Sequence, residues 1–125
     1  MINPAIGTTF LAMDMLSLAS VKAAIRKFAH DRLDILMCNA GIMAVPAAVS
    51  KDGFETHFAI NHLAHAMIIQ QLLPVLLQTA EKPNSDVRVV CLTSLAYRGH
   101  PAGGVQFDKV RTPMDRVFGS WIRYG

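Results

Sequence analysis

The sequence is poor in charged residues. Asp, Glu, Lys and Arg make up 17% of the 125 residues, whereas apolar residues make up 52%. This composition excludes an intrinsically disordered chain, because such chains carry too little apolar surface to bury. The length is sufficient for one small domain and excludes a multidomain organisation.

Runs of basic residues are also absent. The 12 Lys and Arg residues exceed the 9 Asp and Glu residues by three, but they are scattered along the chain. Nucleic acid is therefore not expected as the main partner. The first basic residue is Lys22, so the N-terminus lacks the positively charged region of a secretory signal.

The chain contains no long uninterrupted apolar run. Its most apolar stretch, residues 66–77, has 12 residues and includes Gln70 and Pro74, whereas a helix that spans a bilayer needs about 20. The stretch predicts a buried helix and no transmembrane segment. The only two cysteines, Cys38 and Cys91, lie in apolar runs typical of strands. Reduced thiols and a cytoplasmic location are expected.

What the chain does contain is an alternation of apolar patterns. Short runs rich in strand-forming residues predict three strands, and the second run is apolar enough for a strand covered on both faces. One amphipathic stretch, which begins after a capping Ser17, and one longer, more apolar stretch predict helices. The expected strands are 8–13, 33–38 and 87–92, and the expected helices are 18–28 and 54–78.

The helix expected at residues 54–78 has apolar residues around most of its circumference. One face would cover a sheet, and the other would contact a second surface. A partner subunit is a natural candidate for that surface, so a homo-oligomer formed through this helix is expected. The apolar positions are Phe54, Phe58, Ile60, Leu63, Met67, Ile68, Ile69, Leu72 and Leu73.

The order strand, helix, strand, helix, strand predicts an α/β fold with a parallel sheet. Ligands of such sheets bind outside the carboxyl ends of the strands. Asp14, residues 39–41 and Ser94 each follow a predicted strand, which makes them candidate site residues. Each also has a purely structural explanation, as a strand terminator, a tight turn and a hydroxyl bonded to nearby backbone.

Several motifs occur in a specific order along the chain. They are Asp14 after the first strand, Cys38-Asn39-Ala40-Gly41, Asn61 in Ile60-Asn61-His62-Leu63, Leu73-Pro74, Leu92-Thr93-Ser94, and Tyr124. Over nearly the whole chain this pattern resembles the short-chain dehydrogenase/reductase family, in particular its retinol-dehydrogenase-like and WW-domain-oxidoreductase-like branch.

The resemblance implies a partial Rossmann-type parallel sheet. Residues 1–125 would form one incomplete NAD(P)-binding domain with strands 3, 4 and 5 of the family's order 3-2-1-4-5. Strands 1 and 2, which lie between strands 3 and 4 in that order, would be missing.

The resemblance also assigns cofactor positions. Asp14 would meet the adenine amino group. Asn39, Ala40 and Gly41 would let the backbone run close to the adenosine ribose, and Tyr124 would also contact the cofactor. NADP is the preferred cofactor of the implied branch, with NAD as the alternative.

Three residues would form the catalytic group that the resemblance implies. Ser94 would donate a hydrogen bond to the substrate oxygen, and Tyr124 would transfer the proton. Asn61 would hold a water molecule of the proton relay. The reaction would be hydride transfer between the nicotinamide and an alcohol or carbonyl compound, which the branch suggests is lipophilic.

The sequence departs from the family pattern at both ends. The family has a lysine four residues after the tyrosine and a glycine-rich turn after its first strand, whereas this chain ends at Gly125 and has no such turn. We therefore expect a fragment that is truncated at both ends and inactive alone. The alternatives are a non-catalytic interaction module and an incomplete gene model.

The remaining candidates favour structural roles. His62 and His65 can share a helix face, but no third ligand accompanies them, and no metal site is expected. Tyr97 and Trp121 either line a lipophilic pocket or pack in the core.

Overall fold

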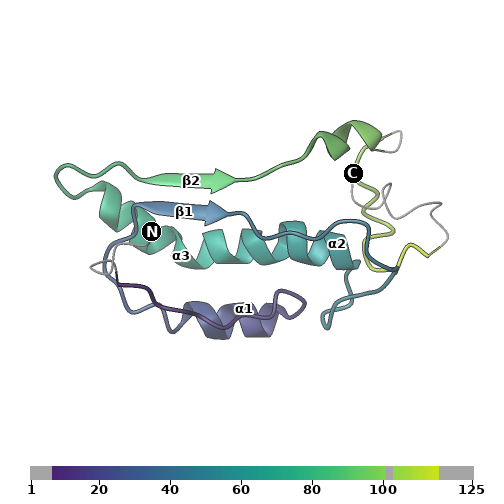
Figure 1. Ribbon diagram of the computed structural model, residues 1–125, viewed down its shortest axis with the longest axis horizontal. Coiled ribbons are helices and arrows are strands. Elements are labelled where there is room, and N and C mark those ends of the chain that lie inside the picture. Colours follow the sequence, from purple (N-terminus) through teal and green to yellow (C-terminus); the bar gives the residue numbers. More distant parts are fainter. Residues whose placement is uncertain (1–6, 101–102, 116–125) are drawn as a thin grey trace.

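A computed structural model of the chain describes residues 7–100 and 103–115. Its sheet consists of β1 (Ile35–Cys38) and β2 (Arg88–Cys91), which run parallel, with Ile35 opposite Arg88 and Cys38 opposite Cys91. A long helix connects the two strands, and its segment α3 lies between β1 and α1 (Figure 1). The predicted α/β fold with a parallel sheet is confirmed, and the second and third expected strands are direct neighbours.

Helix α1 (Leu18–Ile25) forms where the amphipathic pattern predicts a helix. The Ser17 Oγ atom caps it by accepting a hydrogen bond from the Ser20 backbone N–H at 3.3 Å. The Leu18 N–H donates to the Asp52 carboxylate at 2.8 Å, so a distant loop satisfies a second free donor of the first turn. Val21 is fully buried on the face that meets the long helix.

The long helix consists of three consecutive segments, and confirms the expected helix with slightly later bounds. They are α2 (Thr56–Phe58), a π-helical segment (Ala59–Ala64) and α3 (His65–Ala80). The Glu55 carboxylate caps the start by accepting from the Phe58 N–H at 2.8 Å. The sequence pattern did not predict the π-helical segment. Such segments concentrate at functional sites, and this one contains Asn61.

Helix 56–80 has 25 residues and is apolar enough, by length and composition alone, to cross a membrane. The core helix of a soluble protein meets the same criterion. In this structure the helix packs against α1 and bonds to the segments on both sides of β1. The absence of a transmembrane segment stays a prediction.

The strand expected at residues 8–13 is wrong. These residues form neither helix nor strand, and the Phe10 side chain is 88% exposed. A strand needs the backbone of a neighbouring strand to satisfy its N–H and C=O groups. The described part of the chain supplies no such neighbour for this segment, since its sheet contains only β1 and β2.

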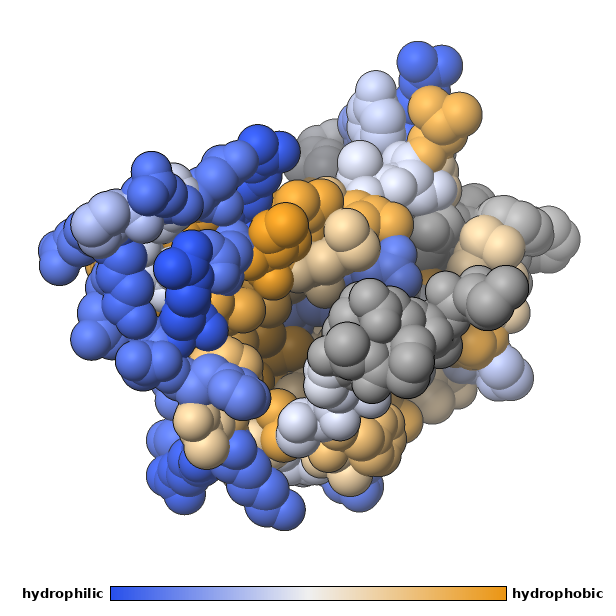
Figure 2. Space-filling view, turned by 60° about the vertical axis from the view of Figure 1, so that its left-hand side comes forward, coloured by the Kyte–Doolittle hydropathy of each residue, from blue (hydrophilic) through white to orange (hydrophobic). Residues whose placement is uncertain are grey.

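The expectation that residues 33–38 are covered on both faces is also wrong. Ile35 and Met37 are 58% and 59% exposed, whereas Cys38, on the other face of β1, is buried. The described helices therefore cover one face of the sheet only. Figure 2 shows apolar side chains gathered in the middle of one side of the molecule, with hydrophilic residues beside them. Large apolar side chains that are at least 40% exposed include Ile35, Met37, Leu73, Leu77, Val89, Leu92 and Leu95.

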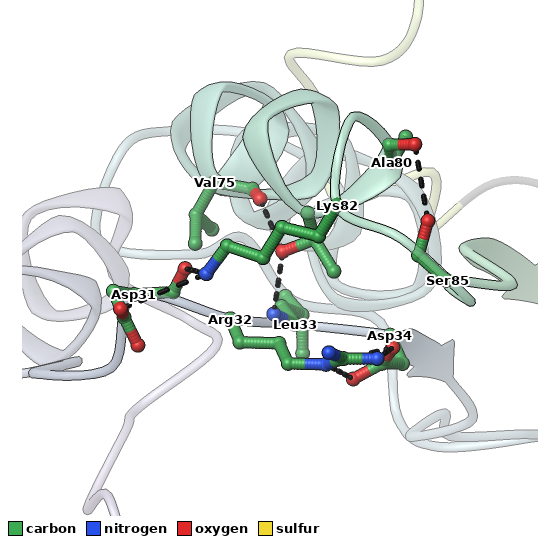
Figure 3. A network of polar contacts seen from close by, with 9 residues as sticks. Asp31, Arg32, Leu33, Asp34, Val75, Ala80, Lys82 and Ser85 are labelled. Atoms are coloured by element: carbon green, nitrogen blue, oxygen red, sulfur yellow. Dashed lines mark hydrogen bonds and ion pairs between the residues drawn. The ribbon is translucent and has the colours of Figure 1, made fainter.

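The end of α3 fixes the start of β1 (Figure 3). The fully buried Thr79 hydroxyl accepts from the Leu33 N–H at 2.9 Å and donates to the Val75 carbonyl at 2.7 Å. The Lys82 ammonium donates to the Asp31 carbonyl at 2.7 Å. These bonds fix the position of β1 relative to the long helix. They therefore help to determine where the carboxyl end of β1 lies.

Candidate active site

A cavity of about 410 Å³ lies at the carboxyl ends of β1 and β2. Three parts of the chain line it: the loop after β1, the segment after β2, and the long helix around the junction between its π-helical segment and α3. Cavities at this edge of a parallel sheet are where ligands bind in open α/β folds. The lining residues are Asn39, Ala40, Gly41, Ile42, Met43, Asn61, His65, Leu92, Thr93, Ser94 and Tyr97.

The long helix holds the loop after β1 at two points. The Asn61 Oδ1 atom accepts from the Ile42 N–H, and Asn61 Nδ2 donates to the Ile42 carbonyl, both at 2.9 Å. One helical turn later, the His65 Nε2 atom lies 2.6 Å from the Ala40 carbonyl oxygen. A Cβ atom on Gly41 would lie 3.2 Å from Asn61 Oδ1, so the close approach favours glycine there.

These contacts give Asn61 an anchoring role that the sequence did not reveal. Its side-chain amide is engaged with the backbone of Ile42 in both directions. An amide group still has a second hydrogen on Nδ2 and a second lone pair on Oδ1. The predicted water-holding role of Asn61 therefore stays a prediction alongside the anchoring role.

Ser94 follows β2 and caps the 3₁₀ helix Leu95–Gly99. Its Oγ atom accepts from the Ala96 N–H at 3.2 Å. Because the hydroxyl acts as an acceptor in this contact, its own hydrogen stays free to be donated. Ser94 lines the cavity and can thus donate to an oxygen atom placed there. Tyr97, from the same 3₁₀ helix, also lines the cavity. Of its two expected roles, pocket lining and core packing, this position agrees with the first.

Asp14 lies apart from the residues that line the cavity. Its Oδ2 atom accepts from the Lys51 ammonium at 2.7 Å, and its Oδ1 atom accepts from the Leu16 N–H at 3.0 Å. The Lys51 hydrogen bond, together with the Leu16 N–H, lowers the pKa of the Asp14 carboxyl below its ordinary value. The Asp14 side chain is 42% exposed, so it is accessible to a ligand.

The structure therefore brings together Asn39, Ala40, Gly41, Asn61 and Ser94, and it leaves Asp14 outside this group. Tyr124 and Trp121 lie outside the described residues. The sequence interpretation missed the role of His65 because its partner, the Ala40 carbonyl, lies 25 positions earlier. The spacing of four between Asn61 and His65 was the one available signal, since it places both on one helix face. Residues 7–100 and 103–115 contain no group of three potential metal ligands.

Comparison with known proteins identifies the family. A family model described as short chain dehydrogenase matches residues 3–105. The chain belongs to the short-chain dehydrogenase family. An oxidoreductase of Schizosaccharomyces pombe is 39% identical over 119 residues, which cover 93% of this chain and 35% of that protein. Human retinol dehydrogenase 13 is 41% identical over 99 residues, which cover 74% of this chain and 27% of that protein.

A solved structure has a similar fold. The crystal structure of a protein of unassigned function from Mycobacterium paratuberculosis matches with a TM-score of 0.68 and 30% sequence identity, over 90% of this chain and 36% of that one. This short-chain dehydrogenase chain thus spans about a quarter to a third of the length of these relatives. The predicted family, its oxidoreductase class and its partial Rossmann-type fold are confirmed.

Proposed function

We propose that this chain contributes the central part of an NAD(P)(H)-dependent oxidoreductase that acts on an alcohol or carbonyl compound. The observation that carries the proposal is the shared cavity. Residues 39–41, Asn61 and Ser94 line one space at the carboxyl ends of two neighbouring parallel strands.

The loop after β1 suits a nucleotide. Asn39, Ala40 and Gly41 are exposed residues, and Gly41 has no side chain to keep a ribose away. The helix anchors this backbone through Asn61 and His65, so the loop is held in place before a ligand arrives. In the proposed complex these residues hold the adenosine half, with Asp14 near the adenine. The bound cofactor would supply or accept the hydride.

Ser94 and Tyr124 would handle the proton and the substrate oxygen. Charge builds on that oxygen when hydride leaves or reaches the carbon, so the free Ser94 hydrogen stabilises it. A tyrosine hydroxyl has an ordinary pKa of about 10, and a phenolate at neutral pH needs about 4 kcal/mol of stabilisation. The family's lysine supplies part of this, and this sequence does not contain it at the matching distance. We therefore expect no turnover by the 125-residue chain alone.

The substrate is proposed to be lipophilic. Met43, Leu92 and Tyr97 give the cavity apolar and aromatic walls beside its polar backbone, and retinol, for which one relative is named, is a lipophilic alcohol. NADP is proposed over NAD on the resemblance to that branch. A cytoplasmic location is proposed because the described cysteines are free thiols, as in a reducing compartment.

Backbone NMR with added nucleotide tests the proposal. NADPH and NADH are titrated separately into the labelled chain, and the amide shifts of Asn39, Ala40, Gly41 and Ser94 are followed. Weak saturable binding is expected, with the largest changes at these residues and the tighter fit for NADPH. Shift changes spread over the helix surface, or none at millimolar nucleotide, would contradict the proposal. Tight binding accompanied by alcohol oxidation would contradict only the expected inactivity.

A second candidate function is assembly through the long helix. Leu73 and Leu77 lie one turn apart on α3 and are 44% and 58% exposed. Exposed apolar neighbours of this kind mark contact surfaces. Sedimentation of the wild-type chain and of Leu77→Glu tests this function, with Gln78→Glu as the matched control. A dimer that Leu77→Glu alone dissociates is expected, and a monomer in all three samples would argue against it.

A further inference from the structure

The two cysteines occupy neighbouring positions on adjacent strands. Cys38 is the last residue of β1 and Cys91 is the last residue of β2, and they are register partners in the parallel ladder. Partner Cα atoms in neighbouring strands lie about 4.8 Å apart. A disulfide bridges Cα atoms that are about 4.4 to 6.8 Å apart. Register partners also point to the same face of a sheet, so the two thiols lie side by side.

The two thiols differ in access to solvent. Cys38, in β1, is 5% exposed, whereas Cys91, in β2, is an exposed residue. Burial, with a smaller effect of the neighbouring Cys91, raises the pKa of the Cys38 thiol. A dissolved oxidant therefore reaches Cys91 first, and Cys38 lies behind it as a second thiol.

We propose that Cys38 and Cys91 form a reversible disulfide when the protein meets a peroxide. The Cys91 sulfur attacks one peroxide oxygen, the O–O bond breaks, and Cys91 becomes a sulfenic acid while one water leaves. The Cys38 sulfur then attacks the Cys91 sulfur, the S–O bond breaks, and a second water leaves with the thiol proton. In total, two thiols and one hydrogen peroxide give one disulfide and two water molecules.

The position of this pair connects it to the cavity. Asn39 and Leu92, which line the cavity, directly follow Cys38 and Cys91. The Leu92 N–H donates to the Cys38 carbonyl at 3.1 Å, so the backbone ladder continues through the pair. A disulfide there must fit the spacing that the ladder imposes, and strained or exposed disulfides are the ones that reduce readily. The inference does not depend on the proposed function, because it requires no nucleotide.

The test counts free thiols on the full 125-residue chain. The reduced protein is treated with a small excess of hydrogen peroxide, quenched, unfolded, labelled with N-ethylmaleimide and weighed by intact mass spectrometry. The expected result is a monomer that has lost two hydrogen atoms and takes up no label, and that takes up two labels after dithiothreitol. Methionine oxidation adds oxygen but does not change the label count. Two labels after peroxide, or a disulfide-linked dimer, would overturn the proposal.

Variants separate the two steps. Cys91→Ser alters an exposed side chain. In this variant Cys38 is expected to remain a free thiol after peroxide treatment and to take up one N-ethylmaleimide label. In Cys38→Ala, Cys91 is expected to stay as a sulfenic acid that dimedone traps. Oxidation of Cys38 in Cys91→Ser at the wild-type rate would overturn the order of attack and with it the proposal. The wild-type label count decides the disulfide even where Cys38→Ala fails to fold.

Discussion

The His65 Nε2 atom lies 2.6 Å from the carbonyl oxygen of Ala40, and this contact ties the first turn of α3 to the loop after β1. His65 is 9% exposed, and its Nδ1 atom has no hydrogen-bond partner among the described residues. The one described hydrogen bond of the ring is therefore made to a residue that lines the candidate nucleotide site.

Replacing His65 by phenylalanine keeps a ring but removes the donor to Ala40. Because a part-buried carbonyl then loses its partner, we expect the free energy of unfolding to fall by about 1 kcal/mol. The largest amide shift changes should occur at Ala40 and Gly41. Urea unfolding and NMR measure the two effects. His62→Phe, which alters an exposed ring on the same helix, is the control. Equal losses in both variants would argue against the anchoring role.

Gly41 and Asn61 are predicted to be energetically coupled. An alanine Cβ at position 41 would lie 3.2 Å from Asn61 Oδ1, so Gly41→Ala must push the amide away from Ile42. Asn61→Ala removes the amide and should cost about 1 to 3 kcal/mol, since it leaves two backbone groups without partners. In that background Gly41→Ala should cost less than in the wild type. A double-mutant cycle measures this coupling, and strictly additive losses would refute it.

Thr79 is predicted to stabilise the start of β1 through its hydroxyl. Thr79→Val keeps the shape but removes the acceptor for the Leu33 N–H and the donor to the Val75 carbonyl. The free energy of unfolding of Thr79→Val is expected to be lower than that of the wild type by about 1 to 3 kcal/mol. Thr79→Ser keeps the hydroxyl and is the matched control, with a smaller loss from the missing methyl group. A serine variant as unstable as the valine variant would show that packing, not the hydroxyl, matters there.

The elements that the sequence predicted correctly are those whose signals are local. Helix α1 follows from Ser17 and the spacing of its apolar residues, and both lie within one stretch. The apolar runs that became β1 and β2 could be read in the same way. The candidate site was predictable in part, because residues 39–41 and Ser94 follow those strands directly.

The features that escaped depend on contacts between distant segments. Residues 8–13 have strand-forming side chains, but pairing requires a neighbour that no local pattern reveals. The roles of Asn61 and His65 depend on backbone groups 19 and 25 positions earlier in the chain. The ion pair of Asp14 with Lys51 likewise spans 37 positions, and sequence spacing gives no sign of it.

The ion pair between Asp14 and Lys51 is predicted to make stability depend on pH. The Lys51 hydrogen bond is the largest cause of the lowered pKa of Asp14, and the Leu16 N–H is the next. The pair's contribution to stability is therefore complete above the ordinary carboxyl pKa of about 3.9 and is lost as the pH falls through the lower value of the folded state. Lys51→Met should raise the pKa of Asp14 towards its ordinary value, without restoring it fully, since Leu16 still donates.

NMR titration of the Asp14 carboxyl carbon measures the shift. Lys22→Met, which removes an exposed charge from α1, is the control and should leave the Asp14 titration close to that of the wild type. Salt should reduce the difference in the Asp14 pKa between the wild type and Lys51→Met. The Lys51 and Asp14 side chains are 69% and 42% exposed, so dissolved ions screen their interaction. An Asp14 titration that Lys51→Met leaves unchanged would mean that Leu16 alone holds the pKa down.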